Sequence, residues 1–331
     1  MQNLSDSSYK ENYDVFAQEL GQLRVKRNEP MMGHTMFRIG GPADLFFETF
    51  SQEELITAVK TARELKIPVF ILGQGANILV SDRGIRGLVI HNRATNIRVV
   101  GLKGHGRGRL GGVDEVFVEA ESGVLINQLV RFSVDDGLEG LEFLLSVPGT
   151  IGGALKINAH FRPEIDEFIG NALAKAKLLT KEGNVVEVER DYFNFGYDKS
   201  EIQKTGDIVL SATFKLKKAD KKKLWQIALE DVKYRDLSQP IGIPCSGCTF
   251  RNPVEENELK VKAAGYLLEK VGLRGFKKGN VQFSQKHANF IQNLGNGKAK
   301  EVLELITLAK RKVKEKFGVE LKEEIFYAGE F

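Results

Sequence analysis

The two cysteines of this 331-residue chain, Cys245 and Cys248, have the C-x-x-C spacing that is typical of a redox dithiol or of half a zinc site. A zinc site needs two further ligands. The five histidines, at positions 34, 91, 105, 160 and 287, show no paired spacing, so we expect no metal. A free cysteine is often a small buried thiol, but it can also donate a proton. The sequence around the pair, PCSGCTFRNP, therefore leaves open whether the two thiols form a redox pair, pack in the interior or donate a proton.

Three glycine clusters have the composition of loops that approach a phosphate closely: Gly40-Gly41, Gly73-x-Gly75, and Gly149 with Gly152-Gly153. Glycine permits both a positive φ and a close approach of backbone N–H groups. No G-x-x-x-x-G-K-[ST] loop is present, and GQGANI lacks the third glycine of the dinucleotide fingerprint, which argues against a Rossmann site. Each cluster alone is more typical of a turn.

The segments that would position these residues mix βαβ and antiparallel patterns, which indicates an α+β fold rather than a doubly wound sheet. Ser51 and Glu54 have capping-box spacing, and Gly137 is a natural helix C-cap. Residues 101–112 predict a flexible hairpin loop, and 141–160 a helix-like stretch that Pro-Gly and Gly-Gly interrupt. Further predicted elements are helices over 13–26, 53–66, 221–236, 259–272 and 299–318, strands within 172–216, a linker at 239–244, and a last strand over 319–329.

Composition favours an enzyme or binding protein that works on small molecules. The net charge is only +4 on 48 basic and 44 acidic residues, without the clustering that a nucleic-acid surface needs. No apolar run is long enough to span a membrane, and the first twenty residues lack the features of a signal peptide. We expect a cytoplasmic protein with reduced thiols, no nucleic-acid partner, and a monomeric or weakly oligomeric state.

Six segments, taken in order, resemble the motifs of UDP-N-acetylenolpyruvoylglucosamine reductases, from about Thr35 to Gly329. They are FRIGGPADLFFE, LGQGANILVSD, GLEGLEFLLSVPGTIGGALKINA, GCTFRNP, AGYLLEKVGLRG and KHANFIQN. The resemblance implies a three-domain α+β flavoprotein. Its two-part FAD-binding region would be of the vanillyl-alcohol-oxidase-like (PCMH) type. Its C-terminal substrate domain would be that of the shorter form of the enzyme, which has no insertions in this domain. The implied parts are a leader (1–34), FAD-binding subdomains 1 (35–94) and 2 (95–217), and the substrate domain (218–331).

The resemblance also implies a reaction. NADPH reduces FAD, and hydride then passes to C3 of the enolpyruvyl ether of a UDP-sugar, so that C2 must be protonated. Cys248 stands where the family has a proton-donating serine. A thiol with a reference pKa of about 8.5 can do the same work. Glu324 takes the position of the family's second acid, whereas Cys245 has no counterpart and is interpreted as packing.

The cofactor and substrate residues follow from the same resemblance. Those assigned to FAD are Arg38, Gly40, Gly41, Gly73, Gln74, Gly75, Ala76, Asn77, Ile78, Pro148, Gly149, Thr150, Ile151, Gly152, Gly153, Ala154 and Asn158. Those assigned to the UDP-sugar nucleotide are Tyr197, Asn252, Lys277 and His287. For His287, a structural role is an equal alternative.

The largest departure from the family lies at Asp198, where the family has an arginine that stabilises enolate and carboxylate charge. An aspartate cannot do this, so either Lys199 or another cation takes the role, or the rate suffers. Two alternatives to the reductase remain: a related flavin oxidase of another small substrate, and a non-catalytic homologue, for which Asp198 is the best evidence.

Overall fold

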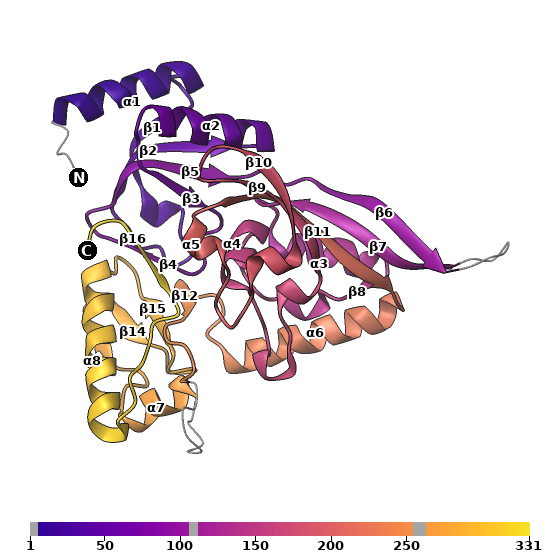
Figure 1. Cartoon of the computed structure of the whole chain (residues 1–331). Coiled ribbons are helices and arrows are strands. Elements are labelled where there is room, and N and C mark those ends of the chain that lie inside the picture. The colour runs from indigo at the N-terminus through magenta and orange to yellow at the C-terminus, as the bar shows by residue number, and fades with distance from the viewer. Residues whose placement is uncertain (1–5, 106–111, 254–262) are drawn as a thin grey trace. The chain divides into compact units, whose positions relative to one another are not determined.

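The structure is a computed structural model that describes residues 6–105, 112–253 and 263–331 (Figure 1). The chain divides into two compact units. Unit 1 comprises the residues up to Val25, Phe47–Gly73 and Ile90–Arg235, and unit 2 comprises Lys26–Phe46, Gln74–Val89 and Asp236–Phe331. Both units combine helices with mostly antiparallel sheets, as the sequence predicts. No helix in the described ranges is long and apolar enough to cross a membrane.

Unit 1 is built on a six-stranded antiparallel sheet in the order β10-β9-β11-β7-β6, with β8 paired to the end of β11 (Figure 1). The strands are β6 (Ile97–His105), β7 (Gly112–Glu121), β8 (Leu138–Glu139), β9 (Leu173–Leu179), β10 (Val185–Glu189) and β11 (Ile208–Lys218). The central strand β11 is buried continuously over residues 209–214, and both α2 and α4 contact it. A strand buried without alternation is covered on both faces.

Unit 1 also contains the following helices, of which α2, α3 and α4 contact strands of this sheet. They are α1 (Asp6–Leu20), α2 (Gln52–Glu64), α3 (Ile126–Asp135), α4 (Ile151–Ile157), α5 (Ile202–Thr205) and α6 (Lys221–Ser238), the last continuing into unit 2, with short 3₁₀ turns η2 (Glu142–Leu144), η3 (Pro163–Ile165), η4 (Ile169–Asn171) and η5 (Arg190–Phe193). Helix α1 docks through Phe16, which is fully buried and packs edge-on against Phe47. Its Asn12 amide also donates to the carbonyl of Leu65 at 2.9 Å.

A four-stranded sheet in the order β1-β2-β5-β3 precedes the large sheet in the chain. Its strands are β1 (Lys26–Pro30), β2 (Pro42–Thr49), β3 (Val69–Leu72) and β5 (Ile85–Asn92), and the 3₁₀ turn η1 (Met31–Gly33) follows β1. The division between the units passes through β2 and β5, so the backbone is continuous across it at these strands.

Unit 2 carries a second antiparallel sheet in the order β12-β15-β14-β13 and a two-stranded parallel pair β16-β4. Its elements are β4 (Ile78–Val80), β12 (Cys245–Cys248), α7 (Ala264–Lys270), β13 (Lys277–Lys278), β14 (Val281–Phe283), β15 (Phe290–Asn293), α8 (Ala299–Phe317) and β16 (Phe326–Ala328). Apolar residues of α8 recur at helical spacing, and Val302, Leu305, Ile306, Ala309 and Val313 are buried. The Asp82 carboxylate caps α8, accepting from the N–H groups of Ala299 and Lys300 at 2.9 and 3.0 Å.

Several local predictions are confirmed. Ser51 Oγ accepts the N–H of Glu54 at 3.2 Å and so caps α2, and Gly137 follows α3 with a φ of +64°. Helix α6 begins at the predicted residue, and α8 covers the predicted long helix within one residue. The hairpin loop is shorter than predicted because β6 runs to His105, and its tip lies outside the described residues, as does the first part of the predicted helix 259–272.

Three predictions were wrong in their extent. The leader helix is α1 and ends at Leu20, because residues from Lys26 onward pair with β2. Gly152-Gly153 does not interrupt a helix but lies in the first turn of α4. A Cβ on Gly152 would lie 3.0 Å from Ser122 Cβ, so glycine is what lets this turn approach so closely. The final strand is limited to β16, since residues before Phe326 are bound to two different segments.

A shared guanidinium holds the loop after α4 in unit 1. Arg162 makes two 2.7 Å hydrogen bonds to the Glu167 carboxylate and lies 3.1 Å from Asp231 of α6, which is only 4% exposed. Burial raises the pKa of Asp231 to about 6, although Arg162 opposes the change and the Glu167 carboxylate adds to it. The folded state therefore holds this proton to a higher pH than the unfolded chain does.

Asp231→Asn tests this burial. The carboxyl of Asp231 has a pKa of 3.8 in the unfolded chain and of about 6 in the folded protein. Between these two pH values the unfolded state has already released the proton that the folded state still holds, so the contribution of Asp231 to stability falls as the pH rises. Relative to Asp231→Asn, the wild type should lose up to about 3 kcal/mol of unfolding free energy over this range, at ~1.4 kcal/mol per pKa unit. Urea denaturation of both proteins over this pH range measures the difference. Asp191→Asn, at an exposed acid, is the control. A relative gain in wild-type stability would mean that the Arg162 ion pair outweighs burial.

Candidate active site

The segment from Thr35 to Gly41 in unit 2 is a tight turn with close backbone contacts. Arg38 has a φ of +53°, and its N–H donates to the carbonyl of Thr35 at 3.1 Å. A Cβ on Gly40 would lie 2.8 Å from Val80 Cβ, and one on Gly41 would overlap the Asp82 carbonyl at 2.1 Å. Both glycines are thus required by the approach of this turn to β4 and the residues after it.

The buried side chain of Asn293 holds the same turn by hydrogen bonds. The sequence did not predict a role for this residue. It is 4% exposed, and its Nδ2 donates to the carbonyls of Phe37 and Arg38 at 3.0 Å each. Its Oδ1 accepts the N–H groups of Gly295 and Gly297 at 2.9 Å each. One amide therefore satisfies four backbone groups in two segments far apart in the chain. The only sequence signal was its place at the end of KHANFIQN.

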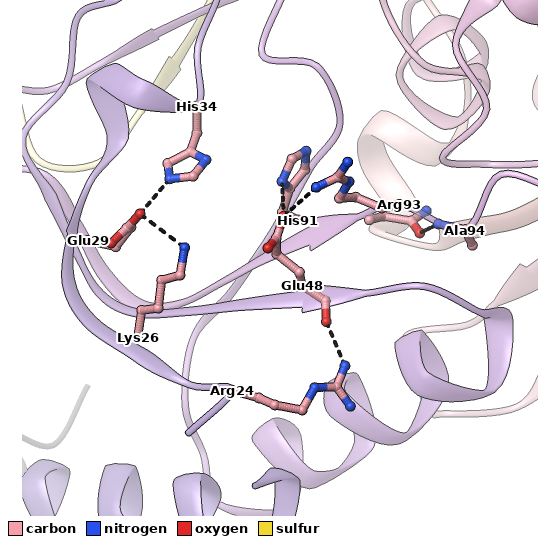
Figure 2. A network of polar contacts seen from close by, with 9 residues as sticks. Arg24, Lys26, Glu29, His34, Glu48, His91, Arg93 and Ala94 are labelled. Atoms are coloured by element: carbon pink, nitrogen blue, oxygen red, sulfur yellow. Dashed lines mark hydrogen bonds and ion pairs between the residues drawn. The ribbon is translucent and has the colours of Figure 1, made fainter. Parts of the chain in front are cut away.

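The segment after Gly73 packs against the residues before Thr35. Gly75 has a φ of +64°, and a Cβ there would lie 2.8 Å from the His34 carbonyl. Figure 2 shows what holds His34: its Nε2 lies 2.8 Å from Glu29 Oε1, which Lys26 also approaches at 3.5 Å. These neighbours, His34 foremost, hold the pKa of Glu29 below its ordinary value. The imidazole also packs on the ring of Phe46 at 4.2 Å between centroids.

The two predicted acids, Cys248 and Glu324, are held on adjoining segments of unit 2. The N–H of Glu324 donates to the carbonyl of Thr249, next to Cys248, at 2.9 Å. The carbonyl of Glu324 accepts from Nδ2 of Asn77, a predicted flavin residue, at 3.3 Å. The N–H of Phe326 then donates to the Asn77 carbonyl at 3.0 Å. We call this chain of contacts through Thr249, Glu324, Asn77 and Phe326 the C-terminal junction.

A bulge in β12 sets the position of Cys248. Cys245 pairs with Gln292 and Cys248 with Phe290, so three steps on β12 face two steps on β15. The extra residue is accommodated at Gly247, which has a φ of +79° and open space within 4 Å of where a Cβ would lie, so that conformation rather than space requires glycine there. Both cysteines are reduced, and no group of three or more His, Cys, Asp or Glu within the described ranges could hold a metal ion.

Glu323, the neighbour of the predicted acid, has a different role. Its carboxylate forms a 2.7 Å ion pair with Lys310 of α8 and accepts from the Tyr327 hydroxyl at 3.1 Å. These partners lower the pKa of Glu323 against the opposing effect of burial. Glu323 also faces Phe250 in an isolated antiparallel bridge, which puts Glu324 beside Thr249 on the alternate face.

The substrate candidates of unit 2 differ in placement. Asn252 Oδ1 accepts the N–H of Ala264 at 3.1 Å and so stabilises the start of α7. His287 Nδ1 accepts the N–H of Asn289 at 3.2 Å, and its ring lies against Gly265. Burial lowers the pKa of His287, and Arg274 adds to this effect. Lys277 is exposed on β13, at the opposite edge of the sheet from β12, so the sheet does not bring it to Cys248.

Unit 1 collects the other glycine-rich residues around the start of α4. A Cβ on Gly73 would lie 2.3 Å from Thr150 Oγ1, so the end of β3 meets the turn before α4. Gly152 donates to the Ser122 carbonyl at 2.9 Å, and Ile151 to that of Val124 at the same distance. Gly153 is exposed and lies in the first turn of α4, where backbone N–H groups lack the acceptors of a preceding turn. An exposed helix N-terminal N–H is suited to an anionic oxygen.

Asn158 ends α4 and joins it to two further segments. It adopts the left-handed conformation with a φ of +50°, which asparagine tolerates better than most residues. Its Nδ2 donates to the Gly196 carbonyl at 3.1 Å, and its Oδ1 accepts the N–H of Gly170 at the same distance. The predicted flavin residue is therefore also the anchor of the turn that carries Tyr197 and Asp198.

Residues 196–199 form a tight turn in which Gly196 and Lys199 exchange backbone hydrogen bonds at 3.1 and 3.2 Å. Asp198 takes the left-handed position with a φ of +53° and is 2% exposed. Its Oδ1 lies 3.8 Å from Nδ1 of His160, whose ring is also 4.9 Å from that of Tyr197. Burial lowers the pKa of His160. Lys199 is exposed, whereas Asp198 is turned into the protein.

Comparisons with known proteins agree with this arrangement. A model of the FAD binding domain matches residues 43–189, and one of the UDP-N-acetylenolpyruvoylglucosamine reductase C-terminal domain matches 239–328. The fold and its glycine-rich loops thus define an α+β flavoprotein with a two-part FAD-binding region and a C-terminal domain, as predicted.

The relatives narrow this class to one family. Reductases of this name from Clostridium tetani and Clostridioides difficile are 37% and 35% identical over 97% and 96% of this chain, and 98% and 99% of theirs. The crystal structure of the Thermus caldophilus reductase aligns with a TM-score of 0.72 at 31% identity, covering 92% of this chain and 99% of that one. The chain belongs to the UDP-N-acetylenolpyruvoylglucosamine reductase family, and is therefore an FAD-dependent oxidoreductase.

Asn293→Ala tests the clamp on the Arg38 turn. Removing the amide leaves buried backbone groups without partners, at a cost of about 1–3 kcal/mol for an unmade buried bond, so a loss of roughly 2 kcal/mol or more is expected. Asn293→Asp should be worse, because a carboxylate would face the carbonyls of Phe37 and Arg38. Denaturant unfolding measures both variants. Equal stability of the wild type and Asn293→Asp would contradict the clamp.

Proposed function

We propose that the protein catalyses the NADPH-dependent, FAD-mediated reduction of UDP-N-acetylglucosamine enolpyruvate to UDP-N-acetylmuramate in peptidoglycan precursor synthesis. The observation that carries this proposal is the C-terminal junction. It ties the backbone next to Cys248 to Glu324, and Glu324 to Asn77, through hydrogen bonds of 2.9 and 3.3 Å. An acid pair fixed beside a flavin-binding segment is what a reaction with one hydride and one proton requires.

The glycine-rich loops have the features that an FAD site needs. The exposed N–H of Gly153 suits an anionic oxygen of the cofactor, and the tight turns at Gly41 and Gly75 leave no room for a Cβ. The residues that would hold FAD are Arg38, Gly40, Gly41 and 74–78 in unit 2, and Gly73, 148–154 and Asn158 in unit 1. When bound, FAD accepts hydride from NADPH and supplies it to C3 of the enolpyruvyl ether.

Residues of the chain itself protonate C2 and position the substrate. The Cys248 thiol donates its proton to C2, which has enolate character after hydride arrives at C3. Glu324 positions the substrate or assists this protonation, while Glu323 remains engaged with Lys310. Cys245 has a packing role. Because Asn252 and His287 already accept backbone N–H groups, each has one polar atom committed to the fold and would offer the other to the UDP-sugar.

Tyr197 and Lys277 complete the substrate set with their hydroxyl and ammonium groups. The protein would act in the cytoplasm, where its nucleotide substrates occur, as a monomer or weak oligomer. A non-catalytic homologue is the second candidate, favoured by the buried aspartate at position 198. Wild-type protein that binds FAD and is reduced by NADPH, but is not reoxidised by the enolpyruvyl sugar nucleotide, would establish that candidate instead.

Cys248→Ala is the direct test of the proton donor. NADPH should reduce the flavin of the variant at nearly the wild-type rate. Reoxidation by the enolpyruvyl sugar nucleotide should be slower by a factor of about 10²–10⁴, as expected for the loss of a general acid. Anaerobic stopped-flow absorbance separates the two half-reactions. Cys248→Ser should retain substantial activity, because a hydroxyl also carries one proton.

Cys245→Ser is the matched control, since the second thiol lies on the same strand. It should change neither half-reaction appreciably. Equal slowing of both half-reactions in Cys248→Ala would mean that Cys248 is structural, and comparable slowing of reoxidation in Cys245→Ser would reject the assignment of the two thiols.

A further inference from the structure

The proposed reaction places negative charge where this chain has no arginine. The enolpyruvyl carboxylate and the enolate need a cation in the transition state. Position 198, however, is an aspartate whose conformation is explained by its turn, because Asp and Asn tolerate the left-handed region at low cost. Its carboxylate is buried and lies 3.8 Å from His160. The stabilising charge must come from another side chain.

Most cations near this turn in unit 1 are already engaged. Arg162 is bound by Glu167 and Asp231, and Lys204 lies 3.0 Å from Glu201. Lys199 is exposed and interacts only at longer range with the Glu201 carboxylate, and no carboxylate among the described residues forms an ion pair with Lys156. These two lysines are therefore the available candidates.

Lys156 shares the exposed side of α4 with a flavin-binding glycine. Ile151, Ala154 and Leu155 are buried, whereas Gly153 and Lys156 are exposed. Residues three apart lie on the same face of a helix, one turn from each other. Lys156 therefore stands one turn beyond the Gly153 N–H, the group suited to an anionic oxygen.

The same residue is tied to the turn that carries Tyr197 and Asp198. Its carbonyl accepts from Ser200 Oγ at 2.5 Å and from Gln203 Nε2 at 2.6 Å. Helix α4 is fixed to this turn a second time through Asn158 and Gly196. The backbone of Lys156 is thus held close to the position at which the family has its arginine.

The surroundings of the ammonium also fit an anion site. Although Lys156 is exposed, desolvation by the surrounding protein lowers its pKa. An ammonium that has lost part of its hydration while still open to solvent attracts an incoming carboxylate more strongly than a fully hydrated one does.

We propose that Lys156 is a catalytic residue that binds the enolpyruvyl carboxylate and stabilises the enolate, in place of the arginine that Asp198 has replaced. The inference rests on the proposed function for its reaction step. Binding of the carboxylate can be tested separately from turnover, because it is measured without reduction of the flavin or the substrate.

Ligand binding gives the first test. Flavin absorbance changes report binding of the enolpyruvyl sugar nucleotide and of UDP-N-acetylglucosamine, which lacks the carboxylate. Lys156→Met should weaken binding of the first by about 10-fold or more and leave the second within about 2-fold, as expected for a lost charge-assisted contact. Lys156→Arg should restore most of the difference. Lys222→Met, at an exposed lysine of α6, is the matched control and should bind both ligands as the wild type does.

The half-reactions give the second test. Lys156→Met should slow flavin reoxidation by the substrate by about 10²–10³-fold, a loss expected for one stabilising group, with reduction by NADPH nearly unchanged. In Lys156→Ala, which removes most of the side chain, ethylammonium should restore part of the lost rate by entering the vacated space. A wild-type protein that binds the carboxylate through Lys156 but does not turn over would reject the proposed function and the catalytic part of this inference, and would keep Lys156 as the carboxylate-binding residue.

Other outcomes would overturn the inference. If Lys199→Met loses carboxylate-dependent binding while Lys156→Met keeps it, the cation is Lys199. If Lys156→Met weakens both ligands equally, or Lys156→Arg fails to rescue, the side chain acts through the fold rather than through its charge. Retention of flavin absorbance by Lys156→Arg shows that the variant is folded.

Discussion

The arrangement of unit 2 depends on the binding of its last residues to two other segments at once. The N–H of Glu324 is bound by the Thr249 carbonyl, and from Phe326 onward the chain pairs in parallel with β4. The segment thus changes partner within two residues, with Asn77 bridging the change. Backbone donors and acceptors in a protein interior must find hydrogen-bond partners. If the last segment shifted by one residue along its neighbours, several of its backbone groups would lose their partners. This constraint fixes Cys248, Glu324 and Asn77 relative to one another.

Where no strand pairing joins two segments, buried asparagine side chains hold them together. Asn293 in unit 2 and Asn158 in unit 1 each use both ends of the side chain, donating to carbonyls of one segment and accepting from N–H groups of another. An amide can serve both kinds of backbone group, whereas a carboxylate cannot donate. The irregular loops predicted to bind FAD are therefore held by side chains rather than by strand pairing.

The departures from the family that the resemblance implies, at positions 198 and 248, are local. Asp198 is accommodated by a turn with positive φ and by burial beside His160, so its carboxylate is not at the surface. Cys248, the proposed acid, lies on a strand whose bulge at Gly247 sets its register. The resemblance implies a serine at position 248 and an arginine at position 198, and the fold accommodates the residues present at both positions. Lys156, on the exposed side of α4, is proposed to supply the charge of that arginine.

The sequence by itself determined the α+β class, the family and the long helices, because periodicity and ordered motifs are local properties of the chain. It also predicted Cys248 and Glu324 as the two acids of the site, and the structure holds them on adjoining segments. It could not show that Gly152-Gly153 begins a helix, since the reason is the approach of Ser122 from the turn after β7. Nor could it find the contacts of Asn293 or the exposed position of Lys156 on α4. Tertiary structure decided these points because hydrogen bonds between distant segments and the protein around a charge leave no periodic trace in the sequence.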